Sequence, residues 1–426
     1  MKIGLFSDRY LPNTDGVTYS IESFRIQLEL MGHEVFIIAP ADSLRHKETN
    51  PKVIRFPAVK GLFFDDYSTS LFFPPQIVRK IDKLGLDIVH YQTPGQVGML
   101  GAYFAIHKKI PLVTTYHTDL FEYVTHYPAV LPGIIALSML GPIVTGGGMD
   151  EYRTGLSAIK PERSIDKWNQ KIVERGVTMV HNHCDMVIAP SEKMMMQLKG
   201  WQTSAPMAIL PTGIDEIMTT KAEINAARKH YGITETDEVI LFVGRVGGEK
   251  NIELLVRAFA LISKHKPTAK LLVIGEGPVR EDMIKLAESE GLSERISFPG
   301  QVLRTKLGAI YALARVFAFP SLADTQGLVV NEAALAGLPI VMIDPHISEI
   351  MRDGVTGLYA RPNAKDLAAK IVQLLDDPAL GSKLGAAARR LALSYSASAQ
   401  ATKLLRLYEE AIKHYREHSS KAKIQR

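Results

Sequence analysis

The stretch Val316–Glu332, VFAFPSLADTQGLVVNE, decides the fold and most of the expected chemistry. Its first residues are continuously apolar, which is typical of a strand buried on both faces of a parallel sheet. The small residues after Glu332, AALAG, predict a helix, and a glycine-containing turn flanked by Asp324 and Glu332 lies between strand and helix. Unpaired N–H groups at a helix N-terminus attract anions, whereas carboxylates suit hydroxyls. The pattern therefore predicts a ligand with both phosphate and hydroxyl groups, as in a nucleotide-sugar.

Similar apolar runs alternate with helical patterns along the whole chain. Apolar residues at steps of three and four predict helices over 17–31 and 252–262. Continuous apolar strands that alternate with helices favour parallel sheets covered on both faces. The predicted strands are KIGLFS, VFIIAP, VIRFP, DIVHYQ, LVTTYH, MVIAP and MAILP in the first half, and VILFVG, KLLVIG, ISFPG, VFAFPS, IVMID and GLYAR in the second.

The length of 426 residues exceeds one ordinary hydrophobic core. We therefore expect an α/β chain with two doubly wound domains, over residues 1–214 and 215–396, and a seam near PTGIDEIMTTKAE. Residues 397–426 are expected to form an amphipathic helix, from about Ala399 to His418, that packs back on the first domain, followed by a basic tail. Ligands of such sheets bind beyond the carboxyl ends of the strands.

Composition excludes several classes of protein. A hydrophobic content of 46% with 22% charged residues is that of a soluble globular protein. The single cysteine, Cys184, excludes an internal disulfide framework and fits a reducing compartment, and MKIGLFSDRY lacks the apolar core of a signal peptide, so a cytoplasmic location is expected. Much of the net charge of +5 comes from the final KHYREHSSKAKIQR, which is either a solvated end or a weak membrane contact. No basic stripe with interleaved aromatics predicts nucleic-acid binding.

Three further loops at predicted strand ends carry polar residues. Asp15 and Gly16 precede the first helix, where the glycine serves either a tight turn or the approach of a phosphate. Arg245 and Lys250 flank paired glycines, so that either both cations converge on a pyrophosphate or the loop is merely solvated. His117 follows the strand LVTTY and is either structural or part of a cleft.

Metal ligation is not predicted. His181 and His183 are not spaced convincingly for a metal together with nearby acids. The adjacent acids Asp65 and Asp66 could hold a metal-bound diphosphate, but a solvated turn is the more ordinary interpretation.

A long apolar segment extends from Pro128 to Met149 without a charged residue. Its prolines and glycines argue against a stable membrane-spanning helix. It is either buried core or a hydrophobic loop, or else a surface that enters the membrane interface or binds acyl chains; in the second case the aromatic FFDDYSTSLFFPP would extend that surface.

Taken together, the motifs resemble a known family along nearly the whole chain. The set IGLFSDRYLPNTDGV, GHEV, PLVTTYHTD, APSEKM, PTGID, FVGRVGGEKN, IGEGP, PSLADTQGLVVNEAALAGLPIV and DGVTGLY is similar to the retaining glycosyltransferases of family 4, which have the GT-B architecture. The resemblance implies two facing Rossmann-like domains with the donor bound mainly by the second and the acceptor by the first. It also implies that no metal or other cofactor is needed.

The resemblance also implies roles for particular residues. Arg245 and Lys250 would hold the donor pyrophosphate, Glu332 the ribose hydroxyls, His117 the transferred sugar, and Asp324 its hydroxyls. The further substrate-binding residues it implies are Asp15, Gly16, Gly244, Val302, Gln326, Gly327, Leu328 and Val329.

One position departs from the family, which usually has Glu where this chain has Asp324. Aspartate reaches about 1.5 Å less, and a misplacement of about 1 Å can cost on the order of 100-fold in rate. We expect a shifted loop, because the other donor positions are intact; a different sugar or a low activity are the alternatives.

We expect a front-face, retaining transfer of a hexose, with UDP-glucose favoured over GDP-mannose, to a membrane lipid such as diacylglycerol or phosphatidylinositol. The enzyme would then be peripheral at the inner face of the cell membrane. A soluble sugar or small-molecule acceptor is the alternative, and a non-catalytic nucleotide-sugar-binding module is a further one.

Overall fold

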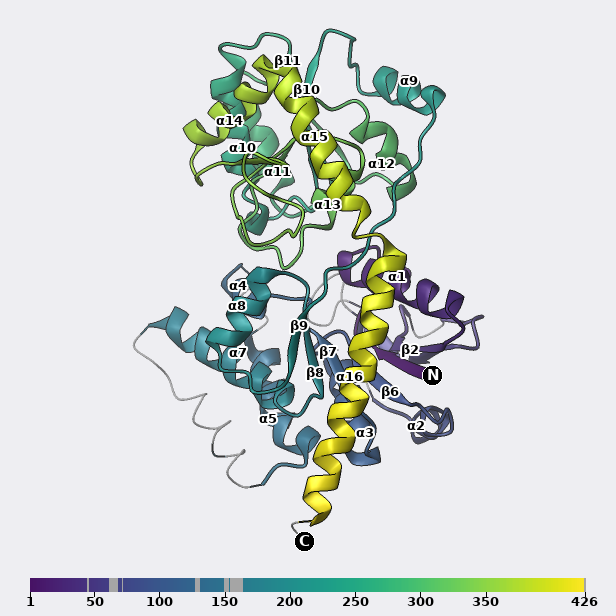
Figure 1. Ribbon diagram of the computed structural model, residues 1–426. Helices are drawn as coiled ribbons and strands as arrows, with labels where there is room; N and C mark the ends of the chain where they lie inside the picture. Colours follow the sequence, from purple (N-terminus) through teal and green to yellow (C-terminus); the bar gives the residue numbers. More distant parts are fainter. Residues whose placement is uncertain are drawn as a thin grey trace. The chain divides into compact units, whose positions relative to one another are not determined.

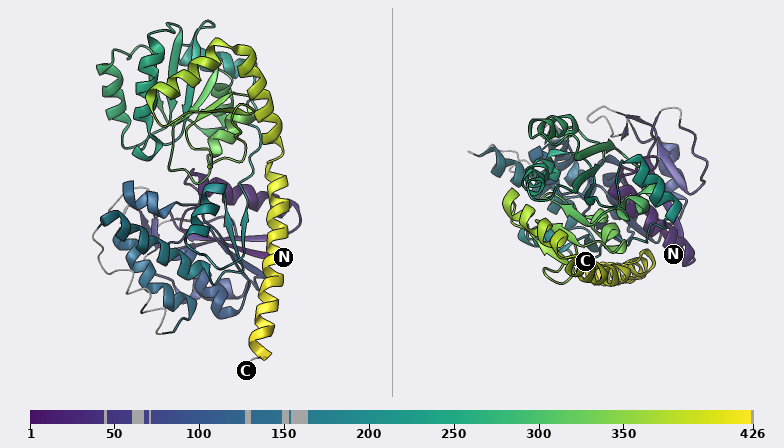
Figure 2. Two further views of the ribbon diagram at one scale, coloured as in Figure 1. Left: turned by 60° about the vertical axis from the view of Figure 1, so that its left-hand side comes forward. Right: turned by 90° about the horizontal axis from the view of Figure 1, so that it is seen from above.

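The computed structural model of the chain describes residues 1–43, 46–60, 68–70, 72–126, 131–148, 153 and 164–424. Two compact units are present: unit 1 comprises Met1–Gly213 with Ala397–Arg426, and unit 2 comprises Ile214–Ser396. Each unit contains a parallel sheet with helices on both faces (Figure 2). The predicted α/β class with two Rossmann-like domains is therefore confirmed.

Unit 1 is built on a seven-stranded sheet with the order β3-β2-β1-β6-β7-β8-β9 (Figure 1). Each of these strands was predicted from an apolar run. Their bounds are β1 Lys2–Phe6, β2 Glu34–Pro40, β3 Val53–Phe56, β6 Ile88–Tyr91, β7 Leu112–Thr115, β8 Met186–Ala189 and β9 Met207–Ile209. The helices are α1 Gly16–Leu30, α2 Pro75–Asp82, α3 Gln96–Lys108, α4 Leu120–His126, α5 Leu131–Thr145, α7 Ile165–His181, α8 Glu192–Gly200 and α16 Ala397–Ile424.

Unit 2 contains a six-stranded parallel sheet with the order β12-β11-β10-β13-β14-β15. These strands were also predicted; they are β10 Glu238–Val243, β11 Ala269–Ile274, β12 Ile296–Gly300, β13 Val316–Phe319, β14 Ile340–Met342 and β15 Gly357–Tyr359. The helices are α9 Lys221–His230, α10 Ile252–Ser263, α11 Arg280–Ser289, α12 Arg304–Tyr311, α13 Leu328–Leu335, α14 Ala364–Asp376 and α15 Pro378–Leu393, with the short 3₁₀ turn η2 at Gly248–Lys250.

Alternation along the strands of unit 1 supplies a hydrophobic layer on each face of its sheet. Leu5 packs in the layer that α1 and α16 cover, whereas its neighbour Phe6 packs in the opposite layer with residues of α3, α7 and α8. Ile37 and Ile38 divide in the same way. Successive side chains of a strand point to opposite faces, so a continuous apolar run is what a doubly covered sheet requires.

Helix α16 belongs to unit 1 although its sequence follows unit 2. Its buried residues Leu404 and Tyr408 join the layer that α1 covers, and the ribbon of α16 runs beside β8 (Figure 1). The helix was predicted to end at about His418, but it continues to Ile424, so the basic tail extends the helix. Residues 419–424 are SSKAKI, and their lysines and alanine have high helix propensity, which favours the extension.

Two features differ from the sequence-based expectations. The short antiparallel pair β4 Ala58–Lys60 and β5 Ser68–Ser70 was not predicted. One interpretation of the apolar segment was a buried core or a hydrophobic loop. The loop is wrong for Leu131–Thr145, because these residues form helix α5, which contains Pro142. Residues 128–130 and 149 of that segment, and the acids Asp65 and Asp66, lie outside the described residues.

A buried polar contact fixes α16 on the sheet. The Tyr408 hydroxyl lies 2.8 Å from Nδ1 of His90, whose Nε2 lies 2.8 Å from the Thr115 hydroxyl. His90 and Tyr408 are both buried, and their rings meet edge to face at 5.6 Å. Tyr408 thus combines a large buried surface with a hydrogen bond to a group that solvent does not reach.

We expect Tyr408→Ala to lower the free energy of unfolding by about 3–5 kcal/mol, as for other large buried aromatic residues. The measurement is urea denaturation followed by circular dichroism. Glu410→Ala, an exposed change on the same helix, should alter stability by no more than about 0.5 kcal/mol. A loss below about 1 kcal/mol for Tyr408→Ala would show that α16 does not depend on this contact.

Candidate active site

The predicted donor residues of unit 2 follow two neighbouring strands. Arg245 and Lys250 come after β10, and Asp324 and Glu332 come after β13. These strands pair with each other, and the order of the sheet reverses between them. Ligands of open parallel sheets bind beyond the carboxyl ends of the strands at such a switch point. The topology therefore brings the loops with the four residues to one ligand-binding edge.

Glycines allow the β10 loop to pass close to the β11 loop. Gly244 has a φ of 152° and Gly275 a φ of 146°, and residues other than glycine rarely adopt this backbone conformation. A Cβ on Gly275 would lie 1.8 Å from the carbonyl oxygen of Gly244. Gly244 was predicted to bind substrate, and the structure gives it this packing role.

Lys250 and Asp324 form an ion pair. The Lys250 Nζ lies 2.5 Å from Oδ1 of Asp324, with both side chains about 15% exposed (16% and 15%). The sequence predicted that a glycine turn would keep Lys250 free to meet a phosphate, but its ammonium is already paired with the acid of the neighbouring loop. Oδ2 of Asp324 is buried and has no hydrogen-bond partner within the described part of the chain. Asp324 therefore retains one acceptor oxygen while its charge is compensated.

Glu332 is also paired. Its side chain is 7% exposed, with Oε1 accepting from the Arg304 Nε at 2.8 Å and Oε2 from the Tyr311 hydroxyl at 2.9 Å. Burial, together with the charge of Glu332, raises the pKa of the Tyr311 phenol well above its ordinary value, so that the phenol remains a donor. Both acids of the opening stretch are thus held by cations.

The turn before α13 shows why Gly327 is needed. A Cβ there would lie 2.8 Å from a methyl of Val330. The N–H groups of Gly327 and Leu328 donate to Ile347 (3.3 Å) and Gln326 (3.0 Å), so these two amides of the predicted phosphate site have backbone partners in the structure. Gln326, Leu328 and Val329 are partly exposed at the start of the helix, and Val302 is partly exposed between β12 and α12.

The predicted residues of unit 1 follow β1 and β7. Asp15 is the N-cap of α1, since its Oδ1 accepts from the Thr18 N–H at 2.9 Å, and its Oδ2 lies 2.6 Å from the Arg9 Nε. Gly16 is the first residue of that helix. The His117 Nε2 lies 2.8 Å from the Gln92 Oε1, which follows β6. Asp15 therefore has a structural role, as the cap of α1, that was not predicted.

Burial lowers the pKa of His117 to about 4, although Asp15 acts in the opposite direction. The imidazole is therefore neutral at physiological pH and available for hydrogen bonding. The Gln92 Oε1 can only accept a hydrogen bond, so the neutral His117 ring must carry its proton on Nε2, and the contact selects this tautomer.

Sequence reasoning missed the partners of the predicted residues. Arg304 and Tyr311 hold Glu332, Arg9 pairs with Asp15, and Gln92 contacts His117. Arg9 follows a predicted strand and Gln92 ends one, and these positions could have suggested them. The contact of Arg304 depends on how α12 and α13 pack, and no local pattern reports that.

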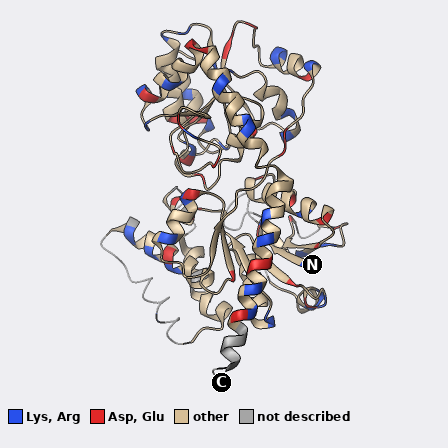
Figure 3. Ribbon diagram, viewed as in Figure 1, with Lys and Arg blue, Asp and Glu red and all other residues tan. Residues whose placement is uncertain are grey.

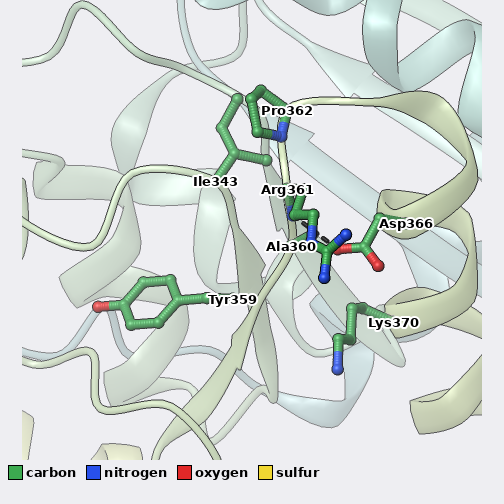
Figure 4. Close-up of a pocket in the computed structure, with 7 residues that line it drawn as sticks. All are labelled: Ile343, Tyr359, Ala360, Arg361, Pro362, Asp366 and Lys370. Atoms are coloured by element: carbon green, nitrogen blue, oxygen red, sulfur yellow. Dashed lines mark hydrogen bonds between the residues drawn. The ribbon is translucent and has the colours of Figure 1, made fainter.

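A hollow of about 330 Å³ opens at the carboxyl ends of β14 and β15 and contains none of the predicted residues. Figure 4 shows Arg361 beside Asp366, with Tyr359 pointing away from them. The Asp366 Oδ2 accepts from the Arg361 N–H at 2.6 Å, so this acid serves the local turn before α14. Among the described residues, no group of three or more His, Cys, Asp or Glu is placed to hold a metal ion.

Known proteins resemble the chain along most of its length. Residues 14–216 match the model of glycosyltransferase family 4, and residues 223–391 match that of the glycosyl transferases group 1. The alpha-monoglucosyldiacylglycerol synthase of Acholeplasma laidlawii is 30% identical over 391 residues, which cover 89% of each chain. The chain belongs to the family 4 glycosyltransferases. It is accordingly an enzyme that transfers a sugar.

Solved structures share the fold of this family 4 glycosyltransferase. The sucrose-phosphate synthase of Thermosynechococcus elongatus matches with a TM-score of 0.70 at 19% identity, covering 96% of this chain and 98% of that one. Anabaena HepE, solved in complex with UDP and glucose, matches with a TM-score of 0.69 at 17% identity, covering 96% and 99%. These likenesses establish the GT-B fold.

We expect the His117 ring of the glycosyltransferase to titrate with a midpoint near pH 4, because burial disfavours its charged form. NMR of the ring proton, assigned with His117→Gln, should show a neutral imidazole at pH 5.5. A midpoint near 6.5, the ordinary value for histidine, would show that water reaches the ring freely.

Proposed function

We propose that this glycosyltransferase moves glucose from UDP-glucose to diacylglycerol with retention of configuration. The observation that carries the proposal is the 30% identity, over 89% of each chain, to a monoglucosyldiacylglycerol synthase. The paired acids and cations at the switch point of unit 2 supply the groups that a nucleotide-sugar needs.

The donor is proposed to bind to unit 2. Arg245 and Lys250 would contact the diphosphate, because Arg can clamp phosphate oxygens and Lys adds a point charge. Glu332 would accept from the ribose hydroxyls, and the backbone near Val302 would contact the base. A UDP-sugar is favoured because the structurally similar HepE was solved with UDP and glucose.

The transfer is proposed to follow a front-face route. The bond between the sugar C1 and the leaving phosphate oxygen breaks, and the acceptor oxygen bonds to C1 on the same face. The acceptor proton passes to the departing diphosphate, so that no protein nucleophile is needed. Arg245 and Lys250 would stabilise the charge that develops on the diphosphate. In this proposal the two cations stabilise the diphosphate without a metal ion, and activity should survive EDTA.

Asp324 is proposed to contact a hydroxyl of the transferred sugar. Its Oδ1 is occupied by Lys250, whereas the buried Oδ2 has no partner among the described residues and can accept from a hydroxyl. The expected shift of the loop would compensate for the shorter side chain. His117 of unit 1, neutral and hydrogen-bonded to Gln92, is proposed to contact the sugar or the acceptor.

The lipid acceptor is supported by the surface of unit 1. Helix α5 has no charged residue, yet Leu140 and Ile143 are 47% and 51% exposed. The neighbouring α7 packs against α5 and carries Lys167, Lys171 and Arg175, which recur at a spacing of four on one face. Figure 3 shows Lys and Arg on α7 and none on α5.

Exposed apolar residues beside a helix with a row of Lys and Arg favour the interface of an anionic membrane. No helix in the described part of the chain is long and apolar enough to cross a membrane. We therefore propose peripheral binding, at the cytoplasmic face of the cell membrane.

The proposal is tested with a panel of UDP- and GDP-sugars and with acceptors that include diacylglycerol, phosphatidylinositol and soluble sugars. Nucleotide release and product are measured together, and the anomeric configuration is read by NMR. Diacylglycerol should yield an α-glucoside from UDP-glucose. Product with soluble acceptors alone would replace the lipid by a soluble substrate, and no transfer under any condition would leave a non-catalytic binding module.

We expect Lys250→Ala to lower kcat by roughly 10- to 100-fold, because it removes a charged hydrogen bond of ~1.5–3 kcal/mol. Steady-state kinetics with the active donor provide the measurement. Lys285→Ala, whose side chain is 74% exposed on α11, is the matched control and should retain wild-type turnover. Unchanged turnover in Lys250→Ala would remove Lys250 from the active site.

We expect Leu140→Asp and Ile143→Asp to reduce binding to anionic vesicles, because each removes an apolar contact and adds a repelled charge. Co-sedimentation with vesicles that contain phosphatidylglycerol should show about a 5- to 10-fold weaker affinity per change, from ~1 kcal/mol or slightly more per charge near the surface. The control is Leu393→Asp on α15, where Leu393 is 52% exposed. Equal binding by all three variants and the wild type would place the membrane contact elsewhere.

A further inference from the structure

The two groups that hold Glu332 come from opposite ends of one helix. Arg304 is the first residue of α12 and Tyr311 the last. The Arg304 Nε donates to Oε1 of Glu332 at 2.8 Å, and the Tyr311 hydroxyl donates to Oε2 at 2.9 Å. The carboxylate of α13 is therefore held at both oxygens by α12.

Helix α12 is itself fixed in place. A Cβ on Gly308, in the middle of the helix, would lie 2.6 Å from the carbonyl oxygen of Ile217. Tyr311 is 1% exposed and packs against Phe317 of β13, with ring centroids 6.0 Å apart. The donors to Glu332 thus stand on an element that packs closely on both sides.

The two contacts leave Glu332 capacity for a ligand. An ionised carboxylate offers about four lone-pair sites, and Arg304 and Tyr311 each occupy one site, on different oxygens. Within the contacts of the described residues, one site on each oxygen remains, and both lie on a group of fixed orientation. Two adjacent acceptors of fixed orientation suit the vicinal diol of a ribose.

We propose that Arg304 is a positioning residue that sets the preference of the enzyme for ribonucleotide over deoxyribonucleotide donors. The inference rests on the proposed function, in which Glu332 binds the ribose. Arg304 orients the carboxylate and compensates its charge, so that the acid tolerates a diphosphate nearby. Its side chain is 40% exposed, so a shorter residue at this position opens no large internal cavity.

Lysine cannot replace Arg304 fully. The guanidinium is planar and presents its donors in a fixed fork, whereas an ammonium is a point charge on a flexible stem. Arg304→Lys should therefore restore the charge compensation but only part of the orientation. This separates the positioning role from a simple electrostatic one.

The experiment measures the affinity of the full chain for nucleotides by calorimetry. UDP and GDP are titrated into the wild type first, and the tighter nucleotide is compared with its 2′-deoxy and 3′-deoxy forms. The variants are Arg304→Gln, Arg304→Lys and Glu332→Gln, with Lys306→Gln as the matched control, since Lys306 is exposed on the same helix. Thermal unfolding of each variant checks that the fold is retained.

We expect the wild type and Lys306→Gln to prefer the ribonucleotide by about 10- to 100-fold over at least one deoxy form, as for hydrogen bonds to a charged group. Arg304→Gln should reduce this preference to about threefold or less, because the wrongly oriented carboxylate no longer meets both hydroxyls. Arg304→Lys should lie between the two. The double variant Arg304→Gln/Glu332→Gln should discriminate no less than Glu332→Gln alone, because the two residues act as a unit.

Two results would overturn the inference in distinguishable ways. A folded Arg304→Gln variant that keeps the wild-type preference overturns the role of Arg304 and leaves the proposed function intact. A wild type that binds neither UDP nor GDP overturns the proposed donor and, with it, this inference.

Discussion

The parallel pairing of β10 with β13 is the constraint on which the donor side of this glycosyltransferase depends. Ile240 and Leu241 are in register with Val316 and Phe317, and every strand before or after this pair extends the sheet away from it. The loops after the two strands therefore open at a common edge. Residues that are 74 positions apart, Lys250 and Asp324, form an ion pair only because these two strands are neighbours.

Charge compensation explains how acids can occupy an anion-binding turn. A carboxylate and a phosphate about 4 Å apart repel each other by roughly 4 kcal/mol at an effective dielectric constant of 20. Lys250 offsets the charge of Asp324, and Arg304 offsets that of Glu332. The acids can then accept hydroxyls beside a diphosphate, and the exposed Arg245 adds further positive charge on the β10 loop.

The strands of both sheets could be predicted because a doubly covered parallel strand is a continuous apolar run, as VILFV and VFAF are. Helices α1 and α10 were predictable from stripes that the structure buries, such as Ile21 and Phe24. The pair β4 and β5 escaped prediction because each strand has three residues, too few to show a period. In α5, packing against α3 and α7 outweighs the low helix propensity of its proline and glycines.

The site residues that stand in motifs could be predicted, whereas the residues that hold them in position could not. Asp324 and Glu332 stand in a recognisable turn, whereas Arg304 lies 28 positions before its partner in a helix with an ordinary pattern. Asp15 shows the converse, since its position before a helix is explained by capping Thr18 and pairing with Arg9. A distant contact such as that of Arg304 with Glu332 is set by the packing of whole elements, which local sequence does not encode.

Asp324 illustrates why the residues that hold a site carboxylate matter for sugar binding. Considered alone, the shorter side chain predicts a gap of about 1.5 Å between the carboxylate and a sugar hydroxyl. The structure shows that one oxygen of this carboxylate is held by Lys250, so its position is set by the β10 loop as well as by its own loop. Ser321 strengthens this link, because its hydroxyl donates to the Glu249 carbonyl at 3.3 Å. Under the proposed function, the sugar that fits is therefore determined by the separation of the two loops, and the length of one side chain is only part of that distance.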